Sequence, residues 1–259
     1  MMPLKLFANK TFAGANLLTF FLYGALFSAM VFLTLNMIQI QGYSQLQAGM
    51  TLLPFTILLI LVSRWSGGLV DKFGPRWFLI LGPLTVGIGI FYLSFIKVTN
   101  GPSSFWVTYF PGIVLFGLGM SFTVTPLTTT VMGAVSGHFS GTASGINNAI
   151  SRIANVFANA IIGALAILFF TSFLNNSVKK LPLKAEVKTQ IVSEAANLGD
   201  AKVPATLSDQ NKEKIKMAYR DGFINAYVNV MRICALLAVV AALMAFLFIK
   251  NHSLKRLEQ

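Results

Sequence analysis

Six apolar stretches, each long enough to cross a lipid bilayer, constrain the fold of this chain more than any other feature. A helix needs about 20 apolar residues to cross the hydrocarbon core. The stretches run approximately through residues 13–40, 48–69, 77–96, 105–131, 142–173 and 223–249. They exceed the length of a barrel strand, and backbone groups in lipid must be hydrogen-bonded within their own segment. The sequence therefore predicts an all-α integral membrane protein with six transmembrane helices.

The composition agrees with a membrane environment. Of the 259 residues, 55% are hydrophobic and only 11% are charged, whereas about 25% of the residues of a soluble domain are charged. The net charge is +12, but the basic residues lie in the connections between apolar stretches, where membrane proteins place them. We therefore expect lipid as the solvent and no nucleic-acid partner.

The spans divide the chain into three regions. Residues 1–173 hold the first five spans, and residues 221–259 hold the sixth span with a cytoplasmic tail. Residues 174–220 are predicted to form a long solvated extracytoplasmic loop with some amphipathic helix. This loop carries nine Lys and Arg residues, so a count of all basic residues leaves the orientation open. The short connections give the cleaner signal and place both termini in the cytoplasm.

No pattern in the chain indicates an enzyme. The single cysteine, Cys234, lies in an apolar stretch, and neither His138 nor His252 has a metal-like partner pattern nearby. No combination of acid, base and nucleophile lies at membrane depth, and no phosphate-binding glycine loop with a lysine occurs. We expect no enzymatic activity, no metal and no cofactor.

A charged turn between the second and third spans carries the most specific motif of the sequence. It follows the pattern G-x-x-x-D-[RK]-x-G-x-[RK] and consists of Gly67, Asp71, Lys72, Gly74 and Arg76. Gly67 would allow close helix contact, and Gly74 would make the tight turn. Asp71 would face a helix N-terminus or a basic partner in one conformation and lose that contact in another. The alternative is an ordinary polar turn.

This motif and its position resemble the cytoplasmic signature loop of the major facilitator superfamily. Residues 6–12, 41–54 and 142–152 further resemble the C-terminal six-helix half of its fourteen-helix drug:proton antiporter branch. The resemblance implies a multi-pass protein of the bacterial inner membrane that exports lipophilic or drug-like small molecules by alternating access, driven by protons.

A complete member of this branch has two six-helix halves, and this chain supplies one of them. Nothing in it resembles the N-terminal half or the glycine-proline antiporter signature of that half. We therefore expect a missing N-terminal half, which belongs to the same longer chain, to a second copy or to a separate chain. The alternative function is a non-transporting membrane subunit or scaffold that pairs with another half or partner.

By resemblance, the first and fourth helices of each half line the substrate cavity. The first span presents a stripe at helical spacing whose rings and methionine suit bulky lipophilic ligands. The fourth span adds hydroxyl groups, although these could instead bond to their own helix. The candidate cavity residues are Asn16, Phe20, Tyr23, Phe27, Met30, Thr34, Thr123 and Thr125. Helix packing or lipid contact is the alternative for the stripe.

The fifth span carries an unusual polar face. Asn147, Ser151, Asn155 and Asn159 recur every four residues, and Arg152 lies on an adjacent stripe. Polar groups are costly in lipid, so they should face protein or water. By resemblance this helix borders the other half, and we therefore expect a half–half interface or a cavity wall. Packing within this half is the alternative.

The remaining charged residues of the spans are basic. Arg64 and Arg232 are expected to extend their guanidinium groups toward the nearest membrane surface. No Asp or Glu lies inside any of the six spans. A proton-coupled transporter needs a titratable group in the membrane. The proton-carrying carboxylate is therefore expected in the missing half.

Overall fold

Six long helices form a single bundle in the computed structural model, which describes residues 4–179, 182–204 and 207–249. The helices long and apolar enough to cross a membrane are α1 (Lys10–Leu35, continued by the π-helical turn η2, Asn36–Ile40), α3 (Leu53–Phe73), α4 (Pro75–Leu93), α6 (Phe110–Gly133), α7 (Ser140–Lys179) and α9 (Asp209–Phe248). The described residues contain no strand. The prediction of an all-α protein with six spans is confirmed.

Short helical elements connect these six. They are η1 (Leu4–Ala8), α2 (Gln45–Met50), η3 (Gly101–Ser104), α5 (Phe105–Thr108), η4 (Gly137–Phe139), α8 (Ala185–Ser193) and η5 (Glu194–Asp200). Helix α2 begins with a capping box. The Ser44 hydroxyl oxygen accepts a hydrogen bond from the Gln47 backbone amide, and the Gln47 side-chain oxygen accepts one from the Ser44 backbone amide. Such reciprocal bonds satisfy backbone groups that the start of a helix leaves open.

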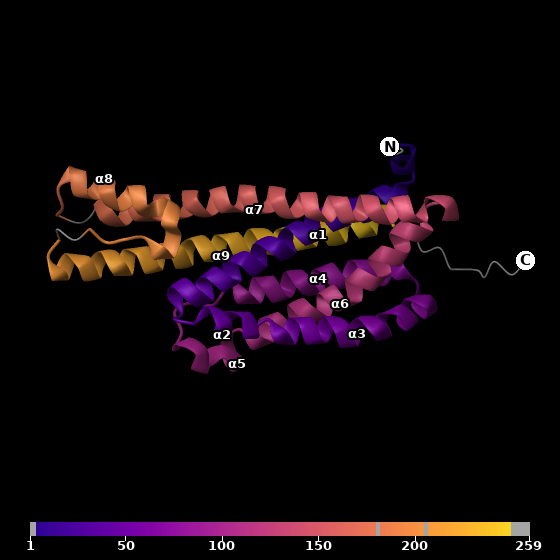
Figure 1. Ribbon diagram of the computed structural model, residues 1–259, viewed down its shortest axis with the longest axis horizontal. Helices are drawn as coiled ribbons and strands as arrows, with labels where there is room; N and C mark the ends of the chain where they lie inside the picture. Colours follow the sequence, from indigo (N-terminus) through magenta and orange to yellow (C-terminus); the bar gives the residue numbers. More distant parts are fainter. Residues whose placement is uncertain (1–3, 180–181, 205–206, 250–259) are drawn as a thin grey trace, which may run out of the picture.

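The bundle has two distinct ends (Figure 1). We call the end where α1 begins and α9 ends the basal end, and the opposite one the projecting end, because α7 and α9 extend there beyond the other helices. Helix α7 runs along one edge of the bundle and α3 along the opposite edge, with α1, α9, α4 and α6 between them.

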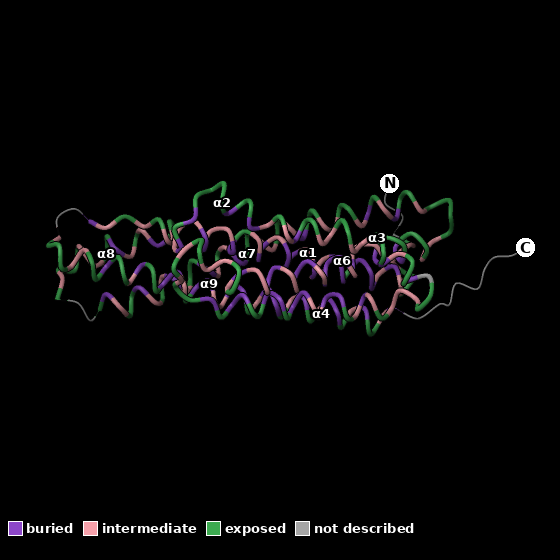
Figure 2. Tube along the Cα trace, turned by 90° about the horizontal axis from the view of Figure 1, so that it is seen from below, coloured by how far each residue is buried: buried purple, intermediate pink, exposed green. Residues whose placement is uncertain are grey.

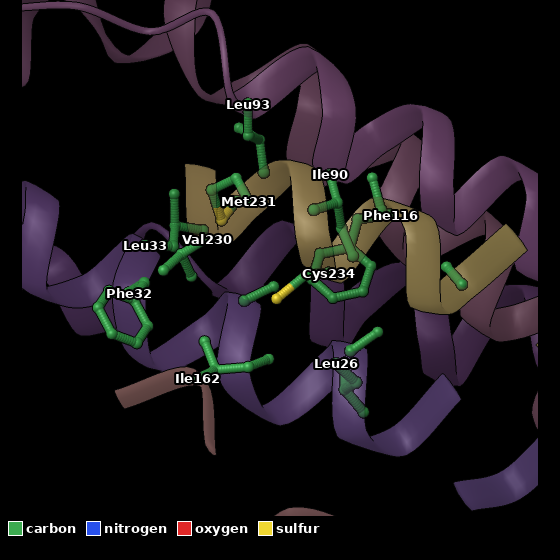
Figure 3. Packing of buried hydrophobic residues seen from close by; sticks show 14 of the residues in the cluster. Leu26, Phe32, Leu33, Ile90, Leu93, Phe116, Ile162, Val230, Met231 and Cys234 are labelled. Carbon is green, nitrogen blue, oxygen red and sulfur yellow. The ribbon is translucent and has the colours of Figure 1, made fainter. Parts of the chain in front are cut away.

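The core forms where α1, α4, α6, α7 and α9 meet. Figure 3 shows Cys234 of α9 among apolar side chains from neighbouring helices, including Leu26, Ile90 and Phe116. Cys234 is fully buried. Burial raises the number of dispersion contacts of each side chain, and this packing holds the five helices around one centre.

The six spans differ strongly in how much of each the bundle covers (Figure 2). Only 17% of the apolar window of the α2–α3 span is buried, and 22% of that of α7, against 44–56% for the other four. The two edge helices therefore present most of their surface to the surroundings of this six-helix unit.

Glycines set the closest helix contact, between α4 and α6. A Cβ atom on Gly119 would lie 2.6 Å from both the Gly82 carbonyl oxygen and the Val86 amide nitrogen, and one on Gly89 would lie 2.7 Å from the Phe116 amide nitrogen. These obstacles are backbone atoms, which cannot rotate away. Lipid tails are as apolar as leucine, so close backbone packing is a main source of attraction between helices in a membrane.

The structure differs from the sequence-based expectation in residues 174–220. The predicted loop is largely helical, because α7 continues to Lys179 and α9 already starts at Asp209. Helices of 40 residues measure about 60 Å, twice the roughly 30 Å of the hydrocarbon core. The charges of this region suggested a loop, but its apolar residues form a small core of their own. Leu174, Val178, Ile191, Ile215 and Tyr219 are all buried.

We call residues 174–179, 182–204 and 207–220 together the projection. The Tyr219 hydroxyl lies 3.2 Å from the Ile191 carbonyl oxygen, to which it donates, and so joins α9 to α8. The Gln39 amide at the end of α1 donates to the Asp200 carboxylate at 2.8 Å. The projection is thus packed on itself and attached to the projecting end of α1.

The glycine contact predicts an asymmetry between two alanine substitutions. Gly119→Ala should lower the free energy of unfolding by about 1–3 kcal/mol, because the methyl group must force two backbones apart. Gly163→Ala is the matched control in the interior of α7, where a Cβ would meet nothing within 4 Å. Thermal unfolding of the purified protein in detergent measures both. Equal midpoints for the two variants would contradict the packing argument.

Candidate functional site

The predicted stripe on α1 occupies the face of that helix that the bundle leaves partly open. Phe20, Tyr23, Phe27, Met30 and Thr34 are all partly exposed. The opposite face is fully buried and includes Leu18, Leu22, Ala25 and Ala29. The five side chains therefore form a continuous, mostly apolar surface along α1, with the Tyr23 hydroxyl and the Thr34 hydroxyl as its polar groups.

Asn16 does not belong to this surface. Its side chain is only 2% exposed and its amide donates to the Phe12 carbonyl oxygen at 2.9 Å. Its carboxamide oxygen accepts a bond from Asn147 of α7 at 3.1 Å. The Asn16 side chain is therefore used in the contact between α1 and α7, and its assignment to the cavity lining stays a prediction.

The two threonines of α6 also point away from α1. Thr123 is fully buried against Gly82 of α4, and its hydroxyl donates to the Gly119 carbonyl oxygen at 2.7 Å. Thr125 is half-buried, and its hydroxyl lies 3.4 Å from the Ser63 carbonyl oxygen of α3. Both hydroxyls are used within the bundle, and the assignment of these two threonines to the cavity stays a prediction. Helical periodicity alone could not choose the face, because α6 has neighbours on two sides.

The asparagines of α7 pack against α1 rather than pointing outward. The Asn147 amide donates to the Thr19 hydroxyl at 2.6 Å as well as to Asn16, and the Ser28 hydroxyl lies 3.2 Å from the Asn159 carboxamide oxygen. The Asn159 amide in turn donates to Asn155 of its own helix. Asn147 and Asn159 thus bond to α1, while Asn155 accepts from its own helix and all three side chains stay partly exposed. Their assignment to a half–half interface or a cavity wall stays a prediction.

These bonds hold α1 and α7 in one register. The pairs Asn16–Asn147 and Ser28–Asn159 have the same sequence separation of 131 residues, so the two helices run parallel. Between the pairs, Gly24 lies against Ala158, where a Cβ on the glycine would be 3.1 Å from the alanine Cβ. Polar contacts at two heights and a small-residue contact between them fix both the distance and the register of the pair.

Ser151 and Arg152 lie differently. The Ser151 hydroxyl donates to the Asn148 carbonyl oxygen of its own helix at 2.8 Å, which satisfies it without any partner helix. Arg152 and Asn148 are exposed. Of the polar residues predicted on α7, only this second stripe faces outward.

The charged motif forms the turn between α3 and α4. Gly74 has φ +79°, a left-handed conformation that favours glycine, and it ends α3 while Pro75 opens α4. The Arg76 guanidinium donates to the Phe246 carbonyl oxygen at 3.1 Å and lies over the Phe246 ring, 5.5 Å from its centroid. Arg76 thus binds the negative end of the α9 helix dipole and attaches the motif to its own half.

The other motif residues are less constrained. A Cβ on Gly67 would meet Thr125 at 3.8 Å, an ordinary contact distance, so the helix approach there does not require glycine. Lys72 is exposed, with its amine 5.6 Å from the centroid of the adjacent Phe73 ring. The Asp71 side chain lies outside the described part of the structure.

Sequence reasoning missed two contacts that join α1 to α6. At the basal end Asn9 caps α1, accepting from the Thr11 amide, and its own amide donates to the Ala134 carbonyl oxygen at 2.7 Å. At the projecting end the Tyr109 hydroxyl donates to the buried Asn36 at 2.6 Å. An asparagine just before an apolar stretch signals a cap, but no sequence pattern indicates which distant carbonyl its amide will reach.

Two neighbouring asparagines of α7 provide a matched test of the α1–α7 contact. Asn147→Ala should lower the free energy of unfolding by about 0.6–2 kcal/mol, because it removes both interhelical bonds and leaves the Asn16 carboxamide oxygen unpaired. Asn148→Ala changes an exposed side chain on the same helix and should leave stability unchanged. Thermal unfolding in detergent measures both. An equal loss for the two variants would show that the α1 contact contributes nothing.

The sequence of this chain is similar to the sequences of known proteins. Residues 2–159 match the Major Facilitator Superfamily. The chain is 31% identical to the multidrug transporter protein MdtP of Bacillus subtilis over 132 residues, which cover 51% of this chain and 24% of that protein. It is 30% identical to the lincomycin resistance protein LmrB of Listeria innocua over 46% of this chain and 25% of that protein.

A longer alignment joins the chain to the multidrug resistance protein Stp of Mycobacterium tuberculosis. The two are 25% identical over 200 residues, which cover 76% of this chain and 36% of that protein. The chain thus spans about a quarter to a third of the length of these curated relatives. With the family match covering more than half of its residues and six spanning helices in the bundle, this chain belongs to the major facilitator superfamily.

Proposed function

We propose that this chain forms one six-helix half of a secondary transporter that exports lipophilic or amphipathic small molecules by alternating access, coupled to protons. The observation that carries the proposal is the α1 surface of Phe20, Tyr23, Phe27, Met30 and Thr34. It is apolar, aromatic and only partly covered by its own bundle. Aromatic rings and methionine adapt to ligands of varied shape, and two hydroxyls give few directional constraints.

The poor coverage of α3 and α7 supports the assignment to one half. Both edge helices are membrane-spanning by length and composition, yet most of their surface is uncovered. The relatives named as a multidrug transporter and a multidrug resistance protein are about three to four times longer than the matched segments. A second six-helix unit placed over these edges would enclose the α1 surface between two halves, as alternating access requires. Both termini of this half would then lie in the cytoplasm of a bacterial cell, and the projection outside the inner membrane.

Proton coupling requires a carboxylate that this half does not supply. The acidic residues of the chain are Asp71 at the end of α3, six between Glu186 and Asp221, and Glu258. None lies inside the six apolar stretches of the sequence, although Asp209, Glu213 and Asp221 belong to the long helix α9. In the proposed transporter the titrating carboxylate therefore belongs to the other half, and this half contributes the apolar wall of the cavity.

The alternative is a membrane subunit that pairs with a partner but transports nothing. Its support is the same uncovered surface, which would serve assembly alone. The decisive experiment expresses the full native polypeptide in cells loaded with a fluorescent lipophilic cation and follows its export with and without a protonophore. Export that the protonophore abolishes supports the transporter. Absence of export for this and other lipophilic compounds, with the protein present in the membrane, supports the subunit.

The charged motif supplies a more specific prediction. Asp71→Asn should slow export about tenfold or more, because a bias of about 1.4 kcal/mol between two conformations changes a rate by that factor. The amount of protein in the membrane should stay nearly the same. Asp221→Asn is the matched control, since Asp221 is the other carboxylate near a span and lies on the surface beside Arg220. Equal export by the wild type and Asp71→Asn would remove the switch role.

A further inference from the structure

Two arginines of the uncovered edges have no ion-pair partner among the side chains that the structure describes. Arg64 of α3 and Arg152 of α7 are both exposed. The surface around Arg64 is otherwise apolar, since Ile60, Leu61 and Trp65 are 66%, 63% and 75% exposed. Each edge helix therefore places one guanidinium group on an exposed face that contacts either lipid or another helix.

Both arginines lie inside helices that are long and apolar enough to span a membrane. Arg64 precedes the end of α3 at Phe73 by nine residues, or about 14 Å along the axis. Arg152 follows the start of α7 at Ser140 by 12 residues, or about 18 Å. The two distances are measured from the same basal end. One cation on each edge of the bundle therefore lies at a similar distance from the basal end, which is the end that carries Lys72 and Arg76.

The described part of this half offers these arginines no acidic partner. Its ion pairs are Lys212–Asp209, Lys216–Glu213 and Arg220–Asp221. All three lie in the first part of α9, which belongs to the projection up to Arg220. The sequence places no Asp or Glu inside a span. Arg76 shows the contrast, because it finds the Phe246 carbonyl oxygen within its own half. An isolated charge at membrane depth is costly, so such residues pair with one another or face a polar partner.

This charge distribution also decides what kind of partner fits. A second copy of this chain would bring two more arginines to the shared face and no carboxylate inside its spans. Like charges brought together in a low-dielectric region repel strongly. A partner half with a carboxylate opposite each edge would instead neutralise both arginines and exclude pairing of the unit with itself.

We propose that Arg64 and Arg152 each form an ion pair with an aspartate or glutamate on a spanning helix of a different six-helix half, and that these pairs prevent self-pairing across this face. The proposal rests on the proposed function in that it requires a second half. The new element is the chemistry of that half, whose spanning helices carry carboxylates at the positions opposite the two arginines.

The test uses Arg64→Lys and Arg152→Lys in the full native polypeptide, in native membranes treated with a hydrophobic carbodiimide. The reagent activates a carboxyl group, the introduced lysine amine attacks the carboxyl carbon, an amide forms, and the urea leaves with the carboxyl oxygen. A lysine amine must lie beside the carboxylate for this to happen. Proteolysis and mass spectrometry then identify the joined peptides.

The expected result is an adduct between each introduced lysine and an Asp or Glu of a spanning segment outside residues 1–259. The matched control is Arg232→Lys, since Arg232 is also exposed but lies on α9, among exposed apolar residues such as Leu236, Val239 and Leu243. This variant should give no adduct. Export should fall about tenfold or more in Arg64→Glu, and recover when the acid identified by the adduct is replaced by lysine.

Three outcomes would overturn the proposal. The first is an adduct to Asp71, whether of the same or a second copy, as the only product. The second is that neither lysine variant forms an adduct, while each elutes at the same position as the wild type after purification and exports at the same rate. That result would mean that the arginines contact lipid phosphates. The third is an equal adduct from Arg232→Lys. A wild-type polypeptide that exports nothing would sink the proposed function instead, whatever adducts form, so the two failures are distinguishable.

Discussion

The close approach of α4 and α6 at glycine is the contact on which the rest of the bundle depends. In lipid, burying an apolar side chain against another helix gains little over burying it against acyl chains. Attraction must come from dense packing, and Gly82, Gly89 and Gly119 bring the two backbones near enough for that. With α4 and α6 fixed as a pair, α3 packs on one side of them and α9 with α1 on the other.

Polar contacts then position α1, the helix that carries the proposed cavity surface. Asn9 and Asn36 attach its two ends to α6, and Asn147 and Asn159 attach its length to α7. An unpaired polar group is expensive in a membrane, so each of these bonds selects one rotation of α1 about its axis. That rotation turns the aromatic and methionine stripe to the side the bundle leaves open. The stripe is thus oriented by residues on the opposite face.

The same reasoning explains why this half is not a closed unit. Most polar groups on its buried faces bond inside the bundle, with the Asn36 amide nitrogen and the Thr130 hydroxyl as exceptions, whereas Arg64 and Arg152 remain on the uncovered faces of α3 and α7. The uncovered faces of α3 and α7 therefore carry positive charge, and the six apolar stretches of the sequence contain no Asp or Glu. In the proposed transporter the complementary half supplies the carboxylates, which proton coupling also needs within the membrane. Assembly and energy coupling would then draw on the same groups.

The sequence by itself determined the membrane environment, the six helices, the turn at Gly74 and the family, because hydropathy, helix length and left-handed backbone geometry are local properties. Periodicity also found the polar face of α7, but it could not say that Asn147 and Asn159 turn toward α1, because a helical stripe carries no record of its neighbour. Thr123 and Arg76 illustrate the same limit, since Gly82 and Phe246 lie far from them in the sequence. The many charged residues in 174–220 predicted a loop, but the apolar residues of this region form a small helical core. Only the tertiary structure decided which polar side chains are consumed inside the half and which stay available to a partner, because that depends on the axial rotation of each packed helix.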